Sequence, residues 1–200
     1  MLISFEGIDG SGKSTQIQLL KEYLLGKGHL VQVFREPGGT AVSEQIRELL
    51  LHPDSEINPV AEMLLFSSAR AQLIAEQVLP ALEKGEVVIL DRFYDSTTAY
   101  QGFGRATISL DYIKVINKVA SHERAPDLTF YLRLSLEESL RRRAHLQKDR
   151  MEQSGHDFFE KVITGYDELA RTEQRVITID ASEEIDQIHK EIVNKVINLV

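Results

Sequence analysis

The residues with the clearest chemical meaning in this chain lie near its amino end. The pattern G-x-x-x-x-G-K-[ST] is matched at every fixed position from Gly7 to Ser14, directly after the apolar run at 1–5. Its glycines allow successive backbone N–H groups to point at phosphate oxygens, and the helix expected from Lys13 adds the positive end of its dipole. We therefore expect a nucleoside triphosphate here, with Lys13 at the β- and γ-phosphates and Ser14 holding Mg²⁺, rather than a turn that merely joins a strand to a helix. The residues expected at the triphosphate are Gly7, Ile8, Asp9, Gly10, Ser11, Gly12, Lys13, Ser14 and Thr15.

Two further groups of polar residues follow apolar runs that read as strands. The segment at 35–40, Arg-Glu-Pro-Gly-Gly-Thr, has the residues of a turn that brings backbone close to a ligand, although a purely structural turn has the same residues. Asp91 and Arg92 follow a later run. The carboxylate could bind Mg²⁺ through water and the guanidinium could clamp a phosphoryl group, unless the two form a plain salt bridge. In open parallel sheets such ligand groups gather at the carboxyl ends of the strands.

A third group could recognise a second ligand. Phe66 and Arg70 lie four residues apart on an expected helix, so they share one face. An aromatic plane beside a fork-shaped donor is suited to stacking on a nucleobase and reading its edge, although Phe66 could also belong to the core. Hydroxyl, ring and amide groups at one-turn spacing follow on a short helix, at Ser96, Thr97, Tyr100 and Gln101.

The elements that must position these groups alternate along the chain. Five short apolar runs read as strands, at 1–6, 29–35, 86–91, 127–133 and 175–180. Helical patterns separate them, at 13–26, 40–51, 59–82, 95–101, 108–122, 135–145, 157–172 and 182–199. Asn58 with Pro59 marks one helix start, and Ser135 with Glu138 forms a capping box at another. The alternation predicts one α/β domain with a five-stranded parallel sheet and helices on both faces.

Composition narrows the class of protein. The chain has 200 residues, 42% of them hydrophobic, which suits one domain with a filled core. Its net charge of −8 argues against a nucleic-acid groove or an anionic membrane surface, because both need an excess of Lys and Arg. It has no cysteine, which is compatible with a reducing cytoplasm, and no apolar run near the ~20 residues of a membrane span. We expect a cytoplasmic protein with no nucleic-acid or membrane partner.

Two segments carry more specific expectations. The helix at 59–82 has apolar residues on several faces, which predicts deep burial or contact with a second subunit. The polar segment at 145–156 has no helical period and reads as a mobile loop between two helices.

Taken together, the motifs resemble those of a known family. They are F-E-G-I-D-G-S-G-K-S-T at 5–15, R-E-P-G-G-T at 35–40, L-F-S-S-A-R-A-Q at 65–72, D-R-F-Y-D-S-T-T-A-Y-Q-G at 91–102 and D-R-M-E at 149–152. On these motifs, and over nearly its whole length, the chain resembles bacterial thymidylate kinases. The resemblance implies the P-loop nucleoside monophosphate kinase fold with a lid at about 145–156. It also implies phosphoryl transfer from MgATP to dTMP, in dTTP synthesis, by a homodimer, for which the helix at 59–82 is the expected contact.

The resemblance further implies a dTMP site with named roles. Phe66 would stack on thymine, and Arg70 and Gln101 would meet the edge of the base. Tyr100 and Asp9 would contact the deoxyribose, while the arginine after the third strand would hold the acceptor phosphate. The dTMP-binding residues expected in all are Asp9, Glu36, Pro37, Phe66, Arg70, Arg92, Ser96, Thr97, Tyr100 and Gln101.

No general base is required for the transfer, because the barrier falls mainly through alignment and neutralisation of charge. Some members of the family resembled carry an arginine in the phosphate loop, and others supply it from the lid. This loop has none. Arg150 in the lid is therefore favoured and Arg141 is expected at ATP, although the triplet at 141–143 also suits the carboxyl end of a helix. The residues expected to act in the transfer are Lys13, Asp9, Arg92 and Arg150, with Mg²⁺ at Ser14 and Asp91.

Two alternative functions stay open at this point. A GTP-dependent switch fits poorly, because Asn117-Lys118-Val119-Ala120 lacks the aspartate of a guanine-reading N-K-x-D motif and lies in a helical pattern. The nearer alternative is a kinase that acts on another deoxynucleotide or on a deoxynucleoside. Phe93 stands where the family often has tyrosine, which leaves the contact of that ring open. The loop at 180–182 is placed to form a wall for adenine.

Overall fold

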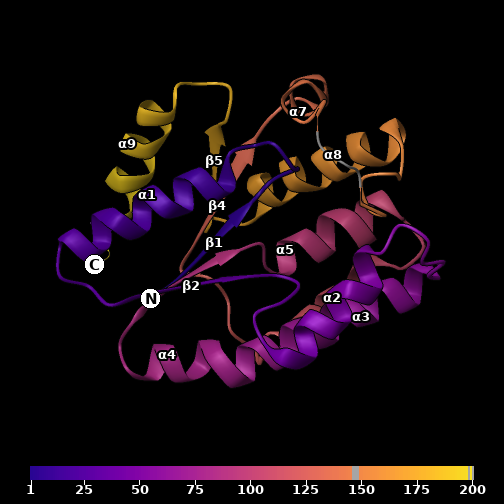
Figure 1. The fold of residues 1–200 in the computed structure, drawn as a ribbon, viewed down its shortest axis with the longest axis horizontal. Helices are drawn as coiled ribbons and strands as arrows, with labels where there is room; N and C mark the ends of the chain where they lie inside the picture. The colour runs from indigo at the N-terminus through magenta and orange to yellow at the C-terminus, as the bar shows by residue number, and fades with distance from the viewer. Residues whose placement is uncertain (146–148, 198, 200) are drawn as a thin grey trace.

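The computed structural model describes residues 1–145, 149–197 and 199 of the chain. Five parallel strands, as the sequence predicts, form one sheet in the order β2-β3-β1-β4-β5 (Figure 1). The strands are β1 (Leu2–Glu6), β2 (Val31–Arg35), β3 (Val87–Asp91), β4 (Leu128–Arg133) and β5 (Val176–Asp180).

Helices connect the strands in the predicted alternation. They are α1 (Lys13–Gly26), α2 (Ala41–Leu51), α3 (Pro59–Leu73), η1 (Ile74–Val78), α4 (Leu79–Glu83), α5 (Tyr94–Thr97), η2 (Thr98–Gly104), α6 (Leu110–Ala120), α7 (Leu136–Arg142), α8 (His156–Thr172) and α9 (Ile185–Val196). The helix expected at 59–82 is continuous in the chain as α3, η1 and α4, of which η1 is π-helical. Likewise, α5 continues directly into the π-helical η2. Within the described residues no helix is long and apolar enough to cross a membrane.

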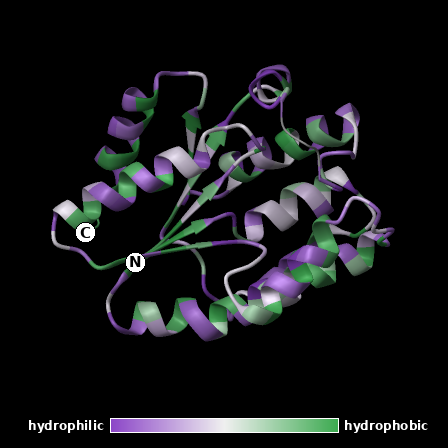
Figure 2. Ribbon diagram, in the orientation of Figure 1, coloured by the Kyte–Doolittle hydropathy of each residue, from purple (hydrophilic) through white to green (hydrophobic). Residues whose placement is uncertain are grey.

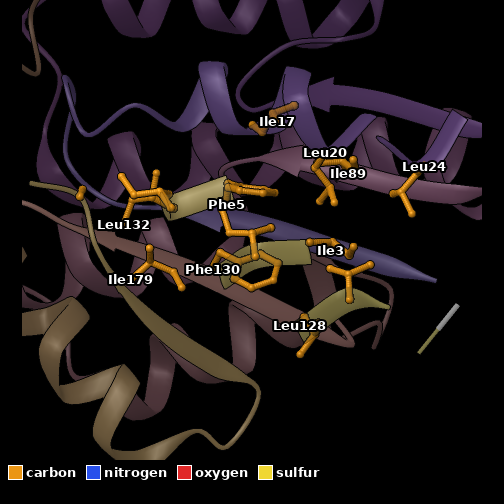
Figure 3. Close-up of a cluster of buried hydrophobic side chains, with 14 of the residues drawn as sticks. Ile3, Phe5, Ile17, Leu20, Leu24, Ile89, Leu128, Phe130, Leu132 and Ile179 are labelled. Carbon is orange, nitrogen blue, oxygen red and sulfur yellow. The ribbon is translucent and has the colours of Figure 1, made fainter. Parts of the chain in front are cut away.

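One face of the sheet packs against α1 and α9, which lie together on one side of the strands in Figure 1. Alternate residues of the strands point into this layer, as Ile3 and Phe5 do on β1. The rings of Phe5 and Phe130 lie 5.3 Å apart between centroids, at the middle of the cluster in Figure 3. Leu20 and Leu24 of α1 are fully buried against them. Because successive side chains of a strand point to opposite faces, the residues between these reach the other face of the sheet.

Two groups of helices share the opposite face of the sheet. The run α3–η1–α4 packs Leu73 and Val78 against Leu90 of β3, and α8 with η2 packs Val162 against Tyr131 of β4. Figure 2 shows strands that are largely apolar, whereas the helices alternate between apolar and polar residues. Both faces are therefore covered, as the near-continuous apolar strands require.

The helix starts are capped by the residues that the sequence predicts, with one correction. Asn58 Oδ1 accepts a hydrogen bond from Val60 N (2.9 Å) at the start of α3, and Ser135 Oγ accepts one from Glu138 N (3.2 Å) at the start of α7. The prediction of a full capping box at Ser135 is wrong. The Glu138 carboxylate binds two arginines of its own helix, because their charged donors are stronger than a backbone N–H.

The carboxyl ends of three strands meet where the chain leaves β1. Phe5 of β1 and Arg35 of β2 both pair with Asp91 of β3. The phosphate loop, the turn after β2 and the residues after β3 therefore emerge at one edge of the sheet, where ligands bind in open α/β folds.

Candidate active site

The phosphate loop runs from the end of β1 to the start of α1. Gly7, Gly10 and Gly12 have φ of 132°, 81° and 89°, a region that side chains rarely adopt. A Cβ on Gly7 would stand 2.5 Å from the carbonyl oxygen of Leu132, so β4 also excludes a larger residue there. The curved backbone that the motif predicts is present, and it leads into the amino terminus of α1.

Lys13 closes this loop from the inside. Its Nζ donates to the carbonyl oxygens of Gly7 (3.0 Å) and Ile8 (3.1 Å), and the residue is 7% exposed. Burial and the nearby charge of Arg92 lower the pKa of Lys13 to about 8. At neutral pH the residue is thus a cation, held by backbone oxygens that phosphate oxygens can replace.

The two residues predicted at Mg²⁺ meet at the mouth of the loop. Ser14 Oγ donates to Asp91 Oδ2 over 3.3 Å. A hydroxyl and a carboxylate are oxygen ligands of the kind that Mg²⁺ takes alongside substrate phosphates. The donor set therefore fits this ion.

Arg92 is the centre of a hydrogen-bond network beside the loop. It directly follows β3 with φ of 71°, in the left-handed region that residues with side chains seldom occupy. Its Nη2 donates to Asp9 Oδ1 (2.8 Å) and Tyr100 OH (3.3 Å), and its Nη1 donates to Ser96 Oγ (3.2 Å) and Tyr166 OH (3.3 Å). Partial burial alone would raise the pKa of Asp9, but the charges of Arg92 and the loop lysine hold it well below its usual range. An ionised carboxylate and a fixed cation result.

A buried acid stands behind this network. Glu6, the last residue of β1, accepts hydrogen bonds from Phe93 N (2.8 Å), Ser96 Oγ (2.6 Å) and Tyr166 OH (2.9 Å). Burial and repulsion by Asp95 raise the pKa of Glu6 to about 7. The acid fixes the two hydroxyl groups that hold the Arg92 guanidinium. Sequence reasoning misses it, because it reads as the last residue of a strand.

A pocket opens beside Arg92, between α3, the α5–η2 segment and the turn after β2. Its wall contains every residue that the sequence predicts for dTMP: Asp9, Glu36, Pro37, Phe66, Arg70, Arg92, Ser96, Thr97, Tyr100 and Gln101. We call this cavity the acceptor pocket.

Arg70 is anchored in the wall of the acceptor pocket. Its Nε donates to Glu36 Oε2 (2.7 Å), its Nη1 to Thr97 Oγ1 (3.0 Å) and its Nη2 to the carbonyl oxygen of Phe93 (3.2 Å). Burial raises the pKa of Glu36 to about 7, against the opposing charge of Arg70. A guanidinium has five N–H groups. The three bonds leave two of them for a ligand.

Five further residues line the acceptor pocket without having been predicted for it: Arg47, Leu51, Phe93, Asp149 and Met151. Arg47 of α2 donates from Nη1 to the carbonyl oxygen of Pro37 (2.9 Å), which fixes its cation at the pocket. No motif marks this arginine, because the packing of α2 against α3 brings it in. The ring of Phe93 is fully buried with its centroid 5.6 Å from the Arg70 guanidinium, so its contact needs no hydroxyl.

A second cavity lies over the phosphate loop, on the other side of Arg92. Among its lining residues are Gly10, Gly12, Lys13, Ser14, Thr15, Arg35 and Asp91. It shares Asp9, Glu36, Arg47 and Arg92 with the acceptor pocket. Ligands in the two cavities would therefore meet at these four charged residues.

Arg142, the last residue of α7, and Arg143, which follows it, lie against the phosphate loop. A Cβ on Gly10 would stand 3.1 Å from Cδ of Arg143, whose guanidinium pairs with Glu152. Arg142 donates from Nη1 to the carbonyl oxygen of Gly10 (3.2 Å) and from Nη2 to that of Ala181 (3.0 Å). The 180–182 loop, predicted as a wall for adenine, is thereby tied to the phosphate loop.

Arg150 and Arg141, both predicted to act at the phosphates, pair with carboxylates away from the phosphate loop. Arg150 donates from Nη1 to Oε2 of the buried Glu62 (2.7 Å) and from Nε to the carbonyl oxygen of Leu50 (2.6 Å). Arg141 is exposed and pairs with Glu138. Neither side chain contacts the phosphate loop in the described part of the chain, because each has a carboxylate in reach. Residues 146–148 of the predicted lid lie outside the described residues.

The residue that would signal a guanine site has a structural role instead. Asn117 lies within α6, where its Nδ2 donates to the carbonyl oxygen of Tyr94 (3.1 Å) and to Thr98 Oγ1 (3.0 Å). It joins α6 to the α5–η2 segment and does not follow a strand. Nothing here supports the alternative of a GTP-dependent switch.

The chain is similar to known proteins over nearly its whole length. Residues 5–192 match the family model of thymidylate kinase. A thymidylate kinase from Chlorobaculum parvum is 50% identical over 205 residues, which cover 97% of this chain and 94% of that protein. One from Thermoanaerobacter sp. is 46% identical over 195 residues, covering 97% and 96%. The crystal structure of thymidylate kinase from Ehrlichia chaffeensis matches with a TM-score of 0.80 and 32% identity, covering 100% of this chain and 98% of that one.

Proposed function

This chain belongs to the thymidylate kinase family and phosphorylates dTMP to dTDP in dTTP synthesis, and we propose how its own residues carry out that transfer. The observation that supports the proposal is the junction of two cavities at Asp9, Glu36, Arg47 and Arg92. ATP occupies the cavity over the phosphate loop and dTMP occupies the acceptor pocket. The γ-phosphoryl group and the acceptor phosphate then face each other across Arg92.

The phosphate loop binds ATP and holds its phosphates in line. The backbone N–H groups between Gly7 and Thr15 face the phosphate oxygens, and Lys13 exchanges its two carbonyl partners for the β- and γ-phosphates. Ser14 and Asp91 would hold Mg²⁺. The ion, when bound, neutralises charge on the phosphate oxygens, as phosphoryl transfer requires.

The acceptor pocket reads the base by stacking and by its polar edge. Phe66 offers a ring face, Arg70 offers its two remaining N–H donors, and Gln101 offers an amide. Thymine presents a carbonyl oxygen where cytosine presents an amino group. A donor at Arg70 therefore favours dTMP over dCMP, because two facing donors leave both unpaired.

The sugar and phosphate of dTMP lie toward the loop. Tyr100 and Asp9 contact the deoxyribose, and Arg92 holds the acceptor phosphate between its hydroxyl and carboxylate partners. Arg47 supplies a second cation there, from α2. The side chains that complete the dTMP site are Glu36, Pro37, Ser96 and Thr97.

The lid arginines contribute unequally to the transfer. Arg143, beside Gly10, supplies the cation that the phosphate loop lacks, and Arg142 lines the ATP side between the loop and Ala181. Arg150 reaches the phosphates only if its ion pair with Glu62 opens. Arg141 reaches ATP only by leaving Glu138.

An acceptor panel tests the assigned substrate. The enzyme is supplied with MgATP and with dTMP, dUMP, dCMP, dAMP, dGMP, thymidine or no acceptor, and formation of ADP and of the phosphorylated acceptor is measured. We expect the highest kcat/KM with dTMP and weaker discrimination against dUMP, since one missing methyl group is worth only ~1–3 kcal/mol. Equal use of dTMP and dCMP would contradict the assigned acceptor site.

We also propose a homodimer, joined through α3 and the neighbouring α6. Val60 and Leu64 on α3 are 45% and 47% exposed, and Val115 and Val119 on α6 are 62% and 71% exposed. Apolar side chains in such numbers on adjacent helices are typical of a subunit interface. Light scattering should give twice the 22.7 kDa mass of the chain. Val115→Asp should shift the mass toward one chain, whereas Leu30→Asp, at an exposed residue before β2, should not.

The remaining expectations rest on the sequence. We propose a cytoplasmic location, with which the lack of cysteine is compatible, and no nucleic-acid or membrane partner, against which the net charge of −8 argues. Fractionation of cells that produce the protein tests the location directly.

A further inference from the structure

Glu62 is a fully buried acid on α3, next to the acceptor pocket but outside its wall. Its Oε1 accepts from Gln101 Nε2 (2.9 Å) and Arg105 Nε (3.1 Å). Its Oε2 accepts from Arg105 Nη2 (3.0 Å) and Arg150 Nη1 (2.7 Å). One carboxylate thus joins a pocket residue of η2, the residue that follows η2 and the lid segment.

The surroundings of Glu62 keep it ionised. Burial alone would raise the pKa of this carboxyl, but the hydrogen bonds from Arg105 and Gln101, and the guanidinium charges, hold it below its usual value. A buried acid with two guanidinium partners is stable as the carboxylate, because its desolvation is offset by charge-assisted hydrogen bonds. An ionised carboxylate only accepts hydrogen bonds.

This charge state decides which way the Gln101 amide faces. An amide has one donating end and one accepting end, and only the NH₂ end can meet a carboxylate. With Nε2 held by Glu62, the carbonyl oxygen Oε1 is the end left for the acceptor pocket, which Gln101 lines. Among the described residues we see no hydrogen bond to Oε1 beside the one that Nε2 makes. A ligand with an N–H group would satisfy it.

We propose that Glu62 is a positioning residue for acceptor choice, which locks the Gln101 amide so that the pocket presents an acceptor beside the Arg70 donors. The inference rests on the proposed base site and deepens it. The N3–H and neighbouring carbonyl oxygen of thymine or uracil complement this acceptor–donor pair. Cytosine, with an unprotonated N3 and an amino group, opposes both members of the pair.

The alternative arrangement shows why the lock matters. An unlocked amide can flip, since its two ends have nearly the same shape. It would then present NH₂ to the N3 of cytosine and remove one of the two mismatches. Selectivity at this position therefore depends on a side chain that never touches the nucleotide.

The test is a double-mutant cycle on the ratio of kcat/KM for dTMP to kcat/KM for dCMP. Glu62→Gln should lower the ratio roughly 10-fold, mainly through better use of dCMP, because an amide at position 62 can turn either its oxygen or its NH₂ toward Gln101 and no longer fixes which end faces the pocket. Gln101→Ala should also lower it, and adding Glu62→Gln to Gln101→Ala should cause no further change. Arg105→Lys is the matched control. It removes part of the ion pair but leaves the Gln101 contact, so stability should fall while the ratio stays the same.

A second variant, Glu62→Asp, keeps the test decisive if Glu62→Gln folds poorly. Glu62→Asp keeps the negative charge for both arginines but withdraws it from Gln101 by one methylene, and it should lower the ratio as well. An unchanged ratio in folded Glu62 variants, with a lowered ratio in Gln101→Ala, overturns the positioning role alone. An unchanged ratio in Gln101→Ala overturns the base site itself, and the inference with it.

Discussion

The phosphate loop and the acceptor pocket lie on either side of Arg92 and are built in opposite ways. The loop is one stretch of consecutive residues whose shape comes from the backbone, with positive φ at Gly7, Gly10 and Gly12. The pocket takes side chains from α2, α3, α5, η2 and the turn after β2. The two polar residues proposed to read the base are each held by a buried acid, Arg70 by Glu36 and Gln101 by Glu62.

This difference in construction suggests that the loop controls turnover and the pocket controls the choice of acceptor. In the proposed function, backbone N–H groups and one lysine bind phosphates, which are common to all nucleotides, so we expect the loop to support turnover with little choice of acceptor. Side chains with fixed donors and acceptors are proposed to read the base, so we expect the pocket to set the choice of acceptor. Arg92 lies in both cavities and joins the two. Variants on either side should therefore change different kinetic quantities.

The largest effect is expected on the loop side. Lys13→Ala should lower kcat about 10²- to 10³-fold, as expected for loss of one preorganised electrostatic donor. Steady-state kinetics with circular dichroism to verify folding measures it. Lys21→Ala, on the same helix α1, is the matched control and should behave like the wild type. Near-normal turnover in folded Lys13→Ala would refute the role given to the loop.

Substitutions of the lid arginines should also change different kinetic quantities. Arg143→Ala should lower kcat roughly 10- to 100-fold, less than a lone arginine finger because neighbouring arginines share the charge. Arg150→Ala should mainly raise the KM for dTMP, since Arg150 is tied to Glu62 beside the acceptor pocket. If Arg150→Ala causes the larger fall in kcat, Arg150 leaves Glu62 during turnover and acts at the phosphates.

The alkaline limb of a pH profile probes the loop lysine. The pKa of Lys13 is lowered to about 8, so the ammonium is present below pH 8 and is lost as the pH rises through that value. We expect kcat/KM for ATP to fall about tenfold per unit above this pKa. Lys13→Arg, whose side chain stays charged, should have lower activity but no such fall. A wild-type profile that stays flat to pH 9.5 would contradict the shifted pKa.

The smallest effect is expected at Tyr166, which holds Arg92 between the two regions. Tyr166→Phe removes a hydroxyl that bonds to Arg92, Glu6 and Ser96, without changing the shape of the ring. Each such bond contributes ~0.5–1.5 kcal/mol, so kcat/KM for dTMP should fall several-fold. The choice between dTMP and dCMP should not change. A loss as large as that of Lys13→Ala would mean that Tyr166 contacts the reacting groups.

The sheet and the phosphate loop were predictable from sequence because their signals are local. Apolar runs gave all five strands, and the fixed glycines required the positive φ observed at Gly7, Gly10 and Gly12. The members of the acceptor pocket were predictable through motifs in a resembling family, and all ten line one cavity.

The orientation of the side chains was not predictable, because it depends on partners distant in sequence. Glu62 lies 39 residues from Gln101 and 88 from Arg150, and it holds both. The place of Arg150 follows from this acid, not from its own motif. Arg47 enters the acceptor pocket only because α2 packs on α3.

One measurement separates the two regions most directly: the ratio of kcat/KM for dTMP to that for dCMP, in wild type, Lys13→Ala and Arg70→Ala. We expect a high ratio in the wild type, the same ratio in Lys13→Ala despite its low turnover, and a ratio roughly 10-fold lower or more in Arg70→Ala, which loses the donor at the base edge. Equal use of the two acceptors by the wild type, or full preference for dTMP in Arg70→Ala, would contradict the division between a loop that drives transfer and a pocket that chooses the acceptor.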